Sequence, residues 1–350
     1  MALHVFNLLV KLVVLVKQSG EMMVGGFQLG DQIAVFRKHR LKSLLGCVYR
    51  HFTQPSLNWL FALSALALPL TAQAIDLLPE DGIAPPVGLS AIQIRYVGNR
   101  YEGSYQNGNN AAPTAKLSAD TFAVRYSTTF TLANRPSVFY VEAPYSETKT
   151  ANVAAKDAGW GLGDATFALA HWLHVDRKNE HYAGLVGYLT APTGQYDRQY
   201  TNTVGINTNP SQNRWSAALQ AGHFMRLGAG VGWLLAFDTV WFGENDDFET
   251  GNANDASLKR RPLYTLQTHF SKRFDSHLML GLGYYWVNGG ETKRGGNYNN
   301  NQLNTHRYQL TTTYDLSGGY RIGAQYGGNL KTRNGFDEKE QFSLRFWRFF

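Results

Sequence analysis

Apolar and polar residues alternate with a period of two over most of the chain beyond residue 87. The clearest case is the end of the chain, where Phe342, Leu344 and Phe346 alternate with polar residues. Such alternation is typical of β-strands that have one apolar and one polar face. The pattern predicts twelve strands, at about 88–98, 118–131, 137–145, 163–175, 181–191, 213–226, 231–242, 262–273, 277–287, 305–315, 320–331 and 341–350.

The connections between these strands alternate between short turns and long polar loops. Asn134–Pro136 and Leu227–Gly230 are short turns, and the predicted loops are Glu102–Pro113, Ser146–Leu162, Pro192–Gln212, Gly243–Lys259, Asn288–Asn304 and Arg333–Lys339. Outer-membrane barrels combine short periplasmic turns, long extracellular loops and an even number of antiparallel strands. The sequence therefore predicts an all-β fold, a transmembrane antiparallel β-barrel of about 12 strands spanning residues 88–350.

The last predicted strand ends on the aromatic residue Phe350. An aromatic edge strand promotes aggregation in water, whereas a closed barrel in lipid pairs that edge with its first strand. We expect Gln341–Phe350 to pair with Gly88–Gly98. The strand resembles the terminal assembly signal of bacterial outer-membrane barrels, so Phe350 is the predicted assembly signal.

Residues 1–74 have the features of a leader with a Sec signal peptide. An apolar stretch, Leu57–Leu70, is followed by the small-x-small site Ala72–Ala74 and preceded by the basic residues Arg37, Lys38, Arg40, Lys42 and Arg50. We predict cleavage after Ala74, with Ile75–Val87 as a periplasmic lead-in. The alternatives are a single transmembrane anchor, lipidation at Cys47, and a translation start at Met22 or Met23.

Composition supports a β-protein that is not built to bind nucleic acid. Only 17% of residues are charged, and 35 glycines accompany 19 tyrosines and 20 phenylalanines. The predicted leader holds seven of the 33 basic and two of the 26 acidic residues, so the net charge of +7 falls to +2 without it. Cys47, the one cysteine, also lies in the leader, which excludes disulfides from the rest.

Charged residues occur on the face opposite the aromatic residues, which is the face that would line the lumen. Structural packing and selection of solutes at a constriction are both possible roles for these residues. The candidate lumen-lining residues are Arg95, Arg125, Glu142, Asp164, Asp238, Arg307, Arg321 and Arg345.

Other motifs give weak indications of chemistry. His269 and Ser271 share one strand face, but Lys272 and Arg273 follow them, unlike the motif of the outer-membrane phospholipase. The acidic loop Glu244–Glu249 has no calcium-loop spacing, and no helix follows the glycine-rich run at 159–164. We predict no catalytic residues, no metal site and no cofactor.

Three stretches resemble the family of the MetA pathway of phenol degradation, a set of outer-membrane barrels. They are Gly161–Ala168 (GLGDATFA), Gly187–Tyr196 (GYLTAPTGQY) and the terminal strand. The resemblance implies a channel or transporter, often linked to the uptake of aromatic or hydrophobic compounds. It supplies no catalytic residues, and the long leader departs from the family pattern.

The sequence thus predicts a channel in the bacterial outer membrane for passive uptake of small solutes, aromatic or hydrophobic ones among them. Outer-membrane lipid, lipopolysaccharide, the barrel-assembly machinery and a small-molecule solute are the expected partners. The alternatives are a plugged structural or surface-adhesive barrel and a barrel hydrolase with a Ser/His pair on its outer wall.

Overall fold

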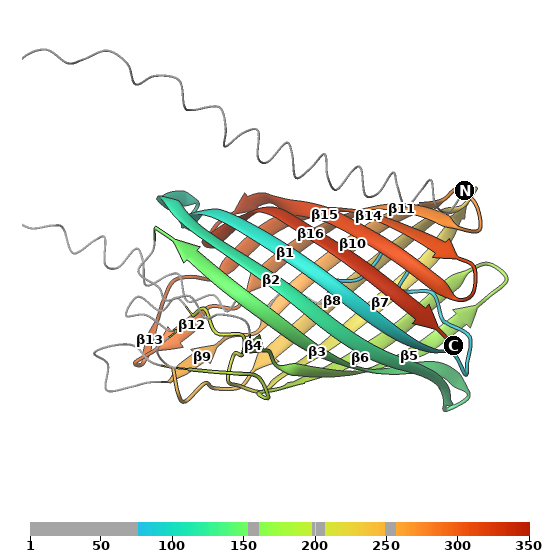
Figure 1. The fold of residues 1–350 in the computed structure, drawn as a ribbon, viewed down its shortest axis with the longest axis horizontal. Coiled ribbons are helices and arrows are strands. Elements are labelled where there is room, and N and C mark those ends of the chain that lie inside the picture. Colours follow the sequence, from blue (N-terminus) through green and yellow to red (C-terminus); the bar gives the residue numbers. More distant parts are fainter. Residues whose placement is uncertain (1–75, 153–160, 198–199, 201–206, 249–256) are drawn as a thin grey trace, which may run out of the picture. The chain divides into compact units, whose positions relative to one another are not determined.

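A computed structural model describes residues 76–152, 161–197, 200, 207–248 and 257–350. Twelve antiparallel strands form a closed barrel (Figure 1), as the alternation predicts. The barrel strands are β1 (Ser90–Gln106), β2 (Asn109–Leu132), β3 (Arg135–Ala151), β5 (Ala165–Asp176), β6 (His181–Ala191), β7 (Ser216–Gly228), β8 (Val231–Phe242), β10 (Leu263–Arg273), β11 (Leu278–Gly289), β14 (Leu303–Leu316), β15 (Tyr320–Thr332) and β16 (Gly335–Phe349). The predicted leader lies outside the described residues.

The barrel closes where the last strand meets the first. β16 pairs with β1 from Ala91 opposite Phe349 to Tyr105 opposite Gly335. Beyond the ladder, the backbone of Phe350 exchanges two hydrogen bonds of 2.9 Å with Ser90. Closure satisfies the backbone groups that an edge strand would expose to hydrocarbon.

Side chains alternate between lipid and lumen along each strand. On β2, Phe122 and Val124 are about half exposed on the outside, while Ala123 between them is buried inside. On β10, Leu266 and Phe270 face outward and the fully buried Gln267 and His269 face inward. This matches the requirement that the outer wall contacts hydrocarbon while polar groups face one another inside. Within the described residues, no helix is long and apolar enough to span a membrane.

Several strands extend further than predicted at the end of the barrel that carries the long loops. The predicted loop Glu102–Pro113 is a β-hairpin, in which Asn107 and Gly108 turn with positive φ angles of 51° and 86°. Two consecutive residues with positive φ are the signature of a tight hairpin turn, and Asn-Gly is the favoured pair. The predicted loop Arg333–Lys339 is likewise reduced to a short turn, because β16 begins at Gly335.

Four short strands lie in the loops of the same end. β4 (Gly161–Leu162) pairs with β3, while β9 (Leu258–Arg260), β12 (Thr292–Arg294) and β13 (Asn297–Tyr298) form a separate three-stranded sheet. The opposite end carries short turns, such as Ala133–Asn134 and Ala229–Gly230. By the usual arrangement of such barrels, the first end is extracellular and the second periplasmic.

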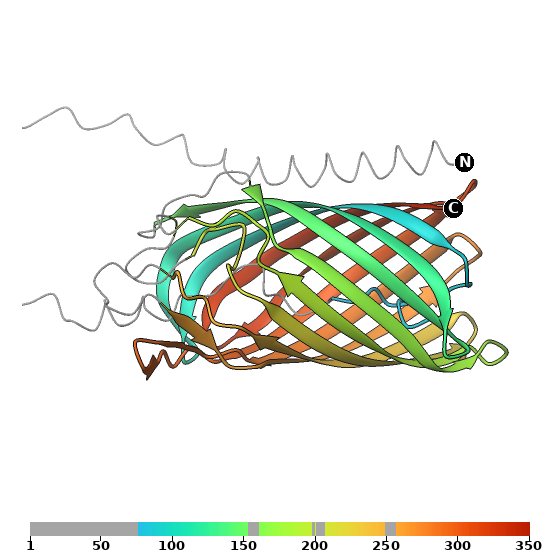
Figure 2. The same cartoon turned by 90° about the horizontal axis from the view of Figure 1, so that it is seen from below.

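The segment Asp76–Pro86, which we call the lumenal segment, lies inside the barrel rather than below it (blue in Figure 2). Its Leu77 backbone binds inward-facing residues of two strands: the amide donates to Gln267 at 3.1 Å, and the carbonyl accepts from Tyr285 at 3.3 Å. Ala84 is buried against Trp172 and neighbouring apolar residues. This position corrects the prediction that the segment is a periplasmic lead-in. The residues that hold it inside lie on strands far along the chain, so the local sequence did not indicate the position.

Deleting Phe350 is expected to impair assembly of the barrel. The deletion removes both backbone hydrogen bonds to Ser90 and leaves the closing strand one residue short, with an aromatic side chain lost from its end. Heat-modifiable migration on gels measures the folded fraction, and we expect a fall of several-fold. Phe274→Ala, which removes an exposed aromatic residue from a periplasmic turn, is the control. Normal heat-modifiable protein in the membrane after the Phe350 deletion would contradict this role.

Candidate functional site

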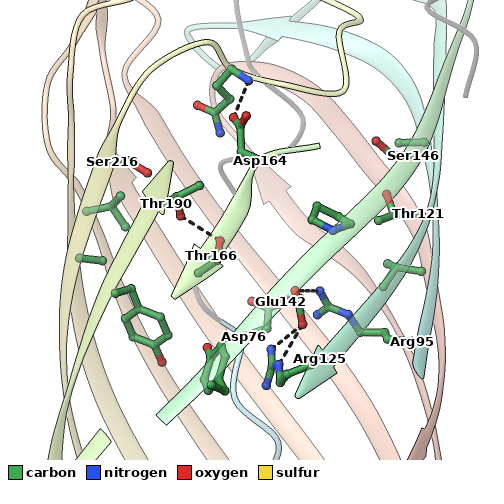
Figure 3. A pocket seen from close by; sticks show the side chains of 18 of the residues that line it. Asp76, Arg95, Thr121, Arg125, Glu142, Ser146, Asp164, Thr166, Thr190 and Ser216 are labelled. Carbon is green, nitrogen blue, oxygen red and sulfur yellow. Dashed lines mark hydrogen bonds and ion pairs between the residues drawn. The ribbon is translucent and has the colours of Figure 1, made fainter. Parts of the chain in front are cut away.

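A cavity of about 260 Å³ occupies the lumen above the lumenal segment (Figure 3). Asp76 lies at one side of it, and Asp164 lies on the side of the extracellular loops. Tyr140, Tyr188 and Phe242 contribute aromatic surface, next to several hydroxyl and charged side chains. The cavity therefore offers both apolar and ionic contacts to a small organic molecule.

One carboxylate in the cavity wall is held by two guanidinium groups. Glu142 on β3 pairs with Arg95 of β1 at 2.6 Å through one oxygen and with Arg125 of β2 at 2.8 Å through the other. Arg125 stands directly opposite Glu142 in the strand register, and its guanidinium carbon lies 4.1 Å from the centre of the Tyr140 ring. Three neighbouring strands thus create the group: Arg125 and Glu142 are directly opposite each other, while Arg95, which stands opposite Ala123 in the register, reaches Glu142 diagonally.

A third arginine makes this cluster electropositive. Arg345 on β16 stands opposite Arg95 in register and is buried. Arg345 forms no ion pair within the described residues, and its Nε atom lacks a hydrogen-bond partner there. The acidic residue of the lumenal segment near this cluster is Asp81, which is exposed and whose carboxylate accepts a hydrogen bond of 2.8 Å from the Leu78 amide. We call Arg95, Arg125 and Arg345 the arginine cluster.

The other predicted lumenal charges divide between separate sites. Arg307 pairs with Glu338 at 3.1 Å and with Asp76 at 3.6 Å, next to the Tyr285 ring. Asp238 is fully buried, and one of its oxygens accepts bonds of 3.4 Å from Gln220 and 3.3 Å from Gln267. These two sites are inside the barrel, and neither includes Glu142 or a member of the arginine cluster.

Arg321 lies at the periplasmic end of the barrel and does not line the cavity. It pairs with Asp315 at 2.5 Å, and Asp315 is also 3.4 Å from Arg273. Arg273 in turn pairs with Glu80 of the lumenal segment. Arg321 thus belongs to an ion-pair network at the periplasmic mouth. Its position there follows from its place at the start of β15.

Glu80 fixes the lumenal segment to the barrel wall. Its carboxylate pairs with Arg226 at 3.0 Å and with Arg273, from strands β7 and β10. Burial tends to raise the pKa of Glu80, but the hydrogen bonds and charges of Arg273 and Arg226 outweigh burial and hold the pKa below its ordinary value. Two residues further along the segment, the backbone carbonyl of Gly82 accepts a hydrogen bond of 2.8 Å from the indole N–H of Trp172.

Asp164 lines the cavity and also organises an extracellular loop. Its oxygens accept hydrogen bonds from the Gly194 amide (3.1 Å), the Ser211 hydroxyl (2.6 Å) and the Gln212 amide (2.8 Å). A Cβ atom on Gly194 would lie only 2.5 Å from the carbonyl carbon of Gly163. The GLGD and PTGQY stretches are thus two halves of one loop anchor, and the glycines permit its close packing.

A Ser/His pair occurs on the outer wall near the periplasmic end. Ser137 Oγ is 2.9 Å from His171 Nδ1, which meets the distance condition for a hydrolase. Ser137 is however fully buried, and among the described residues His171 has no other hydrogen-bond partner to orient it. His269 and Ser271 face the lumen and bind Gln267 and Glu80 instead of each other. Neither pair forms an exposed, oriented nucleophile.

Two buried arginines near the extracellular end were not predicted from sequence. Arg214 precedes β7 and Arg260 ends β9, and both guanidinium groups contact the Phe242 ring. Arg214 lies at the start of the predicted strand 213–226, and Arg260 lies between the predicted loop Gly243–Lys259 and the next predicted strand, so alternation gave neither residue a clear facing. Arginines without a nearby acidic partner in sequence are a weak signal at best.

Comparison with known proteins supports the barrel assignment. The family model described as "Putative MetA-pathway of phenol degradation" matches residues 101–346. The chain belongs to this family. The structure is also similar to the COG4313 outer membrane channel from Pseudomonas putida F1, with a TM-score of 0.73 and 25% identity over 79% of this chain and 100% of that one. Family membership and this similarity support a channel role in the outer membrane.

More distant barrels share less of the structure. The β-domain of the Bordetella autotransporter BrkA matches with a TM-score of 0.48 and 10% identity, over 74% of this chain and 98% of that one. The translocator domain of NalP from Neisseria meningitidis gives 0.43 and 13%, over 78% and 91%. These two similarities are too low to bear on function. Among curated proteins, no significant match was found.

Proposed function

We propose that this barrel is a channel for the passive uptake of small solutes, aromatic and hydrophobic ones among them, and that it favours those carrying a carboxylate or phenolate. The observation that carries this proposal is the arginine cluster: Arg95 and Arg125 share the carboxylate of Glu142, and Arg345 lies opposite Arg95 in the strand register. A cation cluster in a narrow lumen attracts anions and repels cations.

The mechanism requires no chemical step. A solute enters from the extracellular end, where its anionic group approaches Arg345, the member of the cluster that has no ion pair among the described residues. Its apolar body contacts the rings of Tyr140 and Tyr188, which line the cavity together with Arg95 and Arg125 of the cluster. It then leaves past the lumenal segment or through the wall, down its concentration gradient.

Liposome swelling with benzoate and with benzyl alcohol tests the proposal. The two solutes have similar size and differ in charge, so their ratio isolates the role of the cluster. In Arg345→Gln, loss of one unpaired charge costs about 1 kcal/mol at a water-like dielectric, which corresponds to roughly fivefold slower benzoate entry. Benzyl alcohol entry should not change. Equal benzoate rates in the two proteins would contradict the role of the arginine cluster.

A second candidate is a barrel closed by its lumenal segment, which serves as a structural or adhesive surface protein. One observation favours it: the cavity and the recess at the periplasmic mouth, next to Ile83 and Arg226, share no lining residue. This candidate predicts that liposomes containing the wild-type protein swell no faster in benzoate, phenol or sugars than protein-free liposomes.

A further inference from the structure

Arg214 and Arg260 form an unusual pair at the extracellular end of the barrel. Their exposed fractions are only 3% and 7%. The guanidinium carbons lie 5.2 Å and 4.5 Å from the centre of the Phe242 ring. Two like charges are thus gathered around one aromatic ring, away from bulk water, which is costly without a compensating anion.

Neither guanidinium has a carboxylate partner among the described residues. Within the described part of the chain, neither arginine forms an ion pair, and the Nη1 atom of each is buried without a hydrogen-bond partner. Three other donors bind neutral oxygens: Nη2 and Nε of Arg214 donate to Gln212 at 3.0 Å and 3.3 Å, and Nε of Arg260 donates to the Gly290 carbonyl at 3.1 Å. The neighbouring Arg261, by contrast, pairs with Glu291 at 2.7 Å.

Burial without an acidic partner changes the pKa of both guanidinium groups, which lie outside the membrane-spanning strands. Burial lowers the pKa of Arg214 to about 10. Burial, and then the charge of Arg214, lower the pKa of Arg260 to about 9. A bound anion would stabilise the protonated form of both groups and supply acceptors for the two unpartnered Nη1 atoms.

The surroundings indicate what kind of anion would fit. Phe242 and Gln212, which the two guanidinium groups contact, both line the cavity. Phe242 also packs on a buried apolar cluster formed by Leu263 and Val287. An anionic group could therefore meet the guanidinium donors while an apolar body lies along Phe242 and the cluster behind it.

We propose that Arg214, Arg260 and Phe242 form a binding subsite for a small carboxylate with an apolar body, at the extracellular end of the cavity. The subsite is separate from the arginine cluster and would hold a solute before it reaches Arg345. The inference deepens the proposed channel function, because it adds a specific first binding step, but it concerns equilibrium binding and not transport.

Calorimetric titration of the folded barrel in detergent with benzoate, acetate and inorganic phosphate tests the subsite. We expect saturable benzoate binding that is weakened about tenfold in Arg260→Gln, because a charge-assisted hydrogen bond is lost. Arg261→Gln is the matched control, since it changes the adjacent, half-exposed arginine and should bind benzoate normally. Acetate should bind more weakly than benzoate, because it lacks the apolar body.

Several outcomes would overturn the subsite. Benzoate binding in Arg260→Gln equal to wild type would do so, as would phosphate binding that is as tight as benzoate binding. Thermal unfolding of each variant identifies loss of folding, and Arg214→Gln provides a second, independent removal of a guanidinium. If the channel proposal fails but the subsite exists, liposomes that contain the wild-type protein will not swell in benzoate, while the protein in detergent still binds benzoate.

Discussion

Deletion of residues 76–84 is expected to raise the single-channel conductance several-fold. These residues occupy the lumen between the cavity and the periplasmic mouth. Three of them, Asp76, Glu80 and the buried Ala84, contact the barrel wall. Without them, ions cross a wider and more hydrated path. Planar-bilayer recording of the purified barrel measures the change, and heat-modifiable migration verifies that the variant is folded.

The lumenal segment offers a graded version of the same experiment. Glu80→Gln keeps the chain in place but removes the charge that binds Arg226 and Arg273. We expect the single-channel conductance of Glu80→Gln to rise briefly to the level of the deletion variant, because the segment detaches from the wall more often than in wild type. Val87→Ala, at an exposed position just outside the lumen, should behave as wild type. A folded deletion variant with wild-type conductance would show that the segment does not restrict the pore.

Glu142→Gln is expected to strengthen anion preference and to destabilise the barrel. The substitution leaves Arg95 and Arg125 without their shared carboxylate, so the local positive charge rises by one. Loss of charged hydrogen bonds to partly buried groups costs about 1–3 kcal/mol. Urea unfolding in detergent measures the stability change, and the reversal potential measures selectivity.

A matched control for this substitution exists on the extracellular hairpin. Glu102 pairs with Lys116 at 2.9 Å, and both side chains are more than half exposed. Exposed pairs contribute little to stability, so Glu102→Gln should alter neither unfolding nor selectivity. If Glu142→Gln has the same small effects, Glu142 does not balance the arginine cluster.

The period-two pattern predicted the barrel because each strand obeys one local rule: apolar side chains face lipid and polar ones face the lumen. Hence Phe122 and Val124 were placed correctly on the outside. The same rule underestimated β1 and β2, because beyond the membrane the outward positions carry polar residues such as Glu102 and Lys116, so the outer face is no longer apolar. There the turn chemistry of Asn107 and Gly108 was the better signal.

The site was only partly predictable for a different reason. Alternation indicates that Arg95, Arg125 and Glu142 face inward, but their meeting depends on the register of three strands. Arg321 illustrates the limit: it was assigned to the cavity lining, yet it joins the ion-pair network at the periplasmic mouth. Asp164 lines the cavity, but its bonds to the extracellular loop were not predicted. The lumenal segment depends on contacts about 190 residues apart, such as Leu77 with Gln267, which no local pattern encodes.

The central claim is that the wild-type barrel conducts and prefers anions. The most direct test is the reversal potential of single-channel currents across a KCl gradient, with the purified barrel in a planar bilayer. The account predicts a reversal potential between zero and the equilibrium potential of chloride, and a reversal potential closer to zero in Arg345→Gln. A wild-type reversal potential between zero and the equilibrium potential of potassium, or no current through folded wild-type protein, would contradict it.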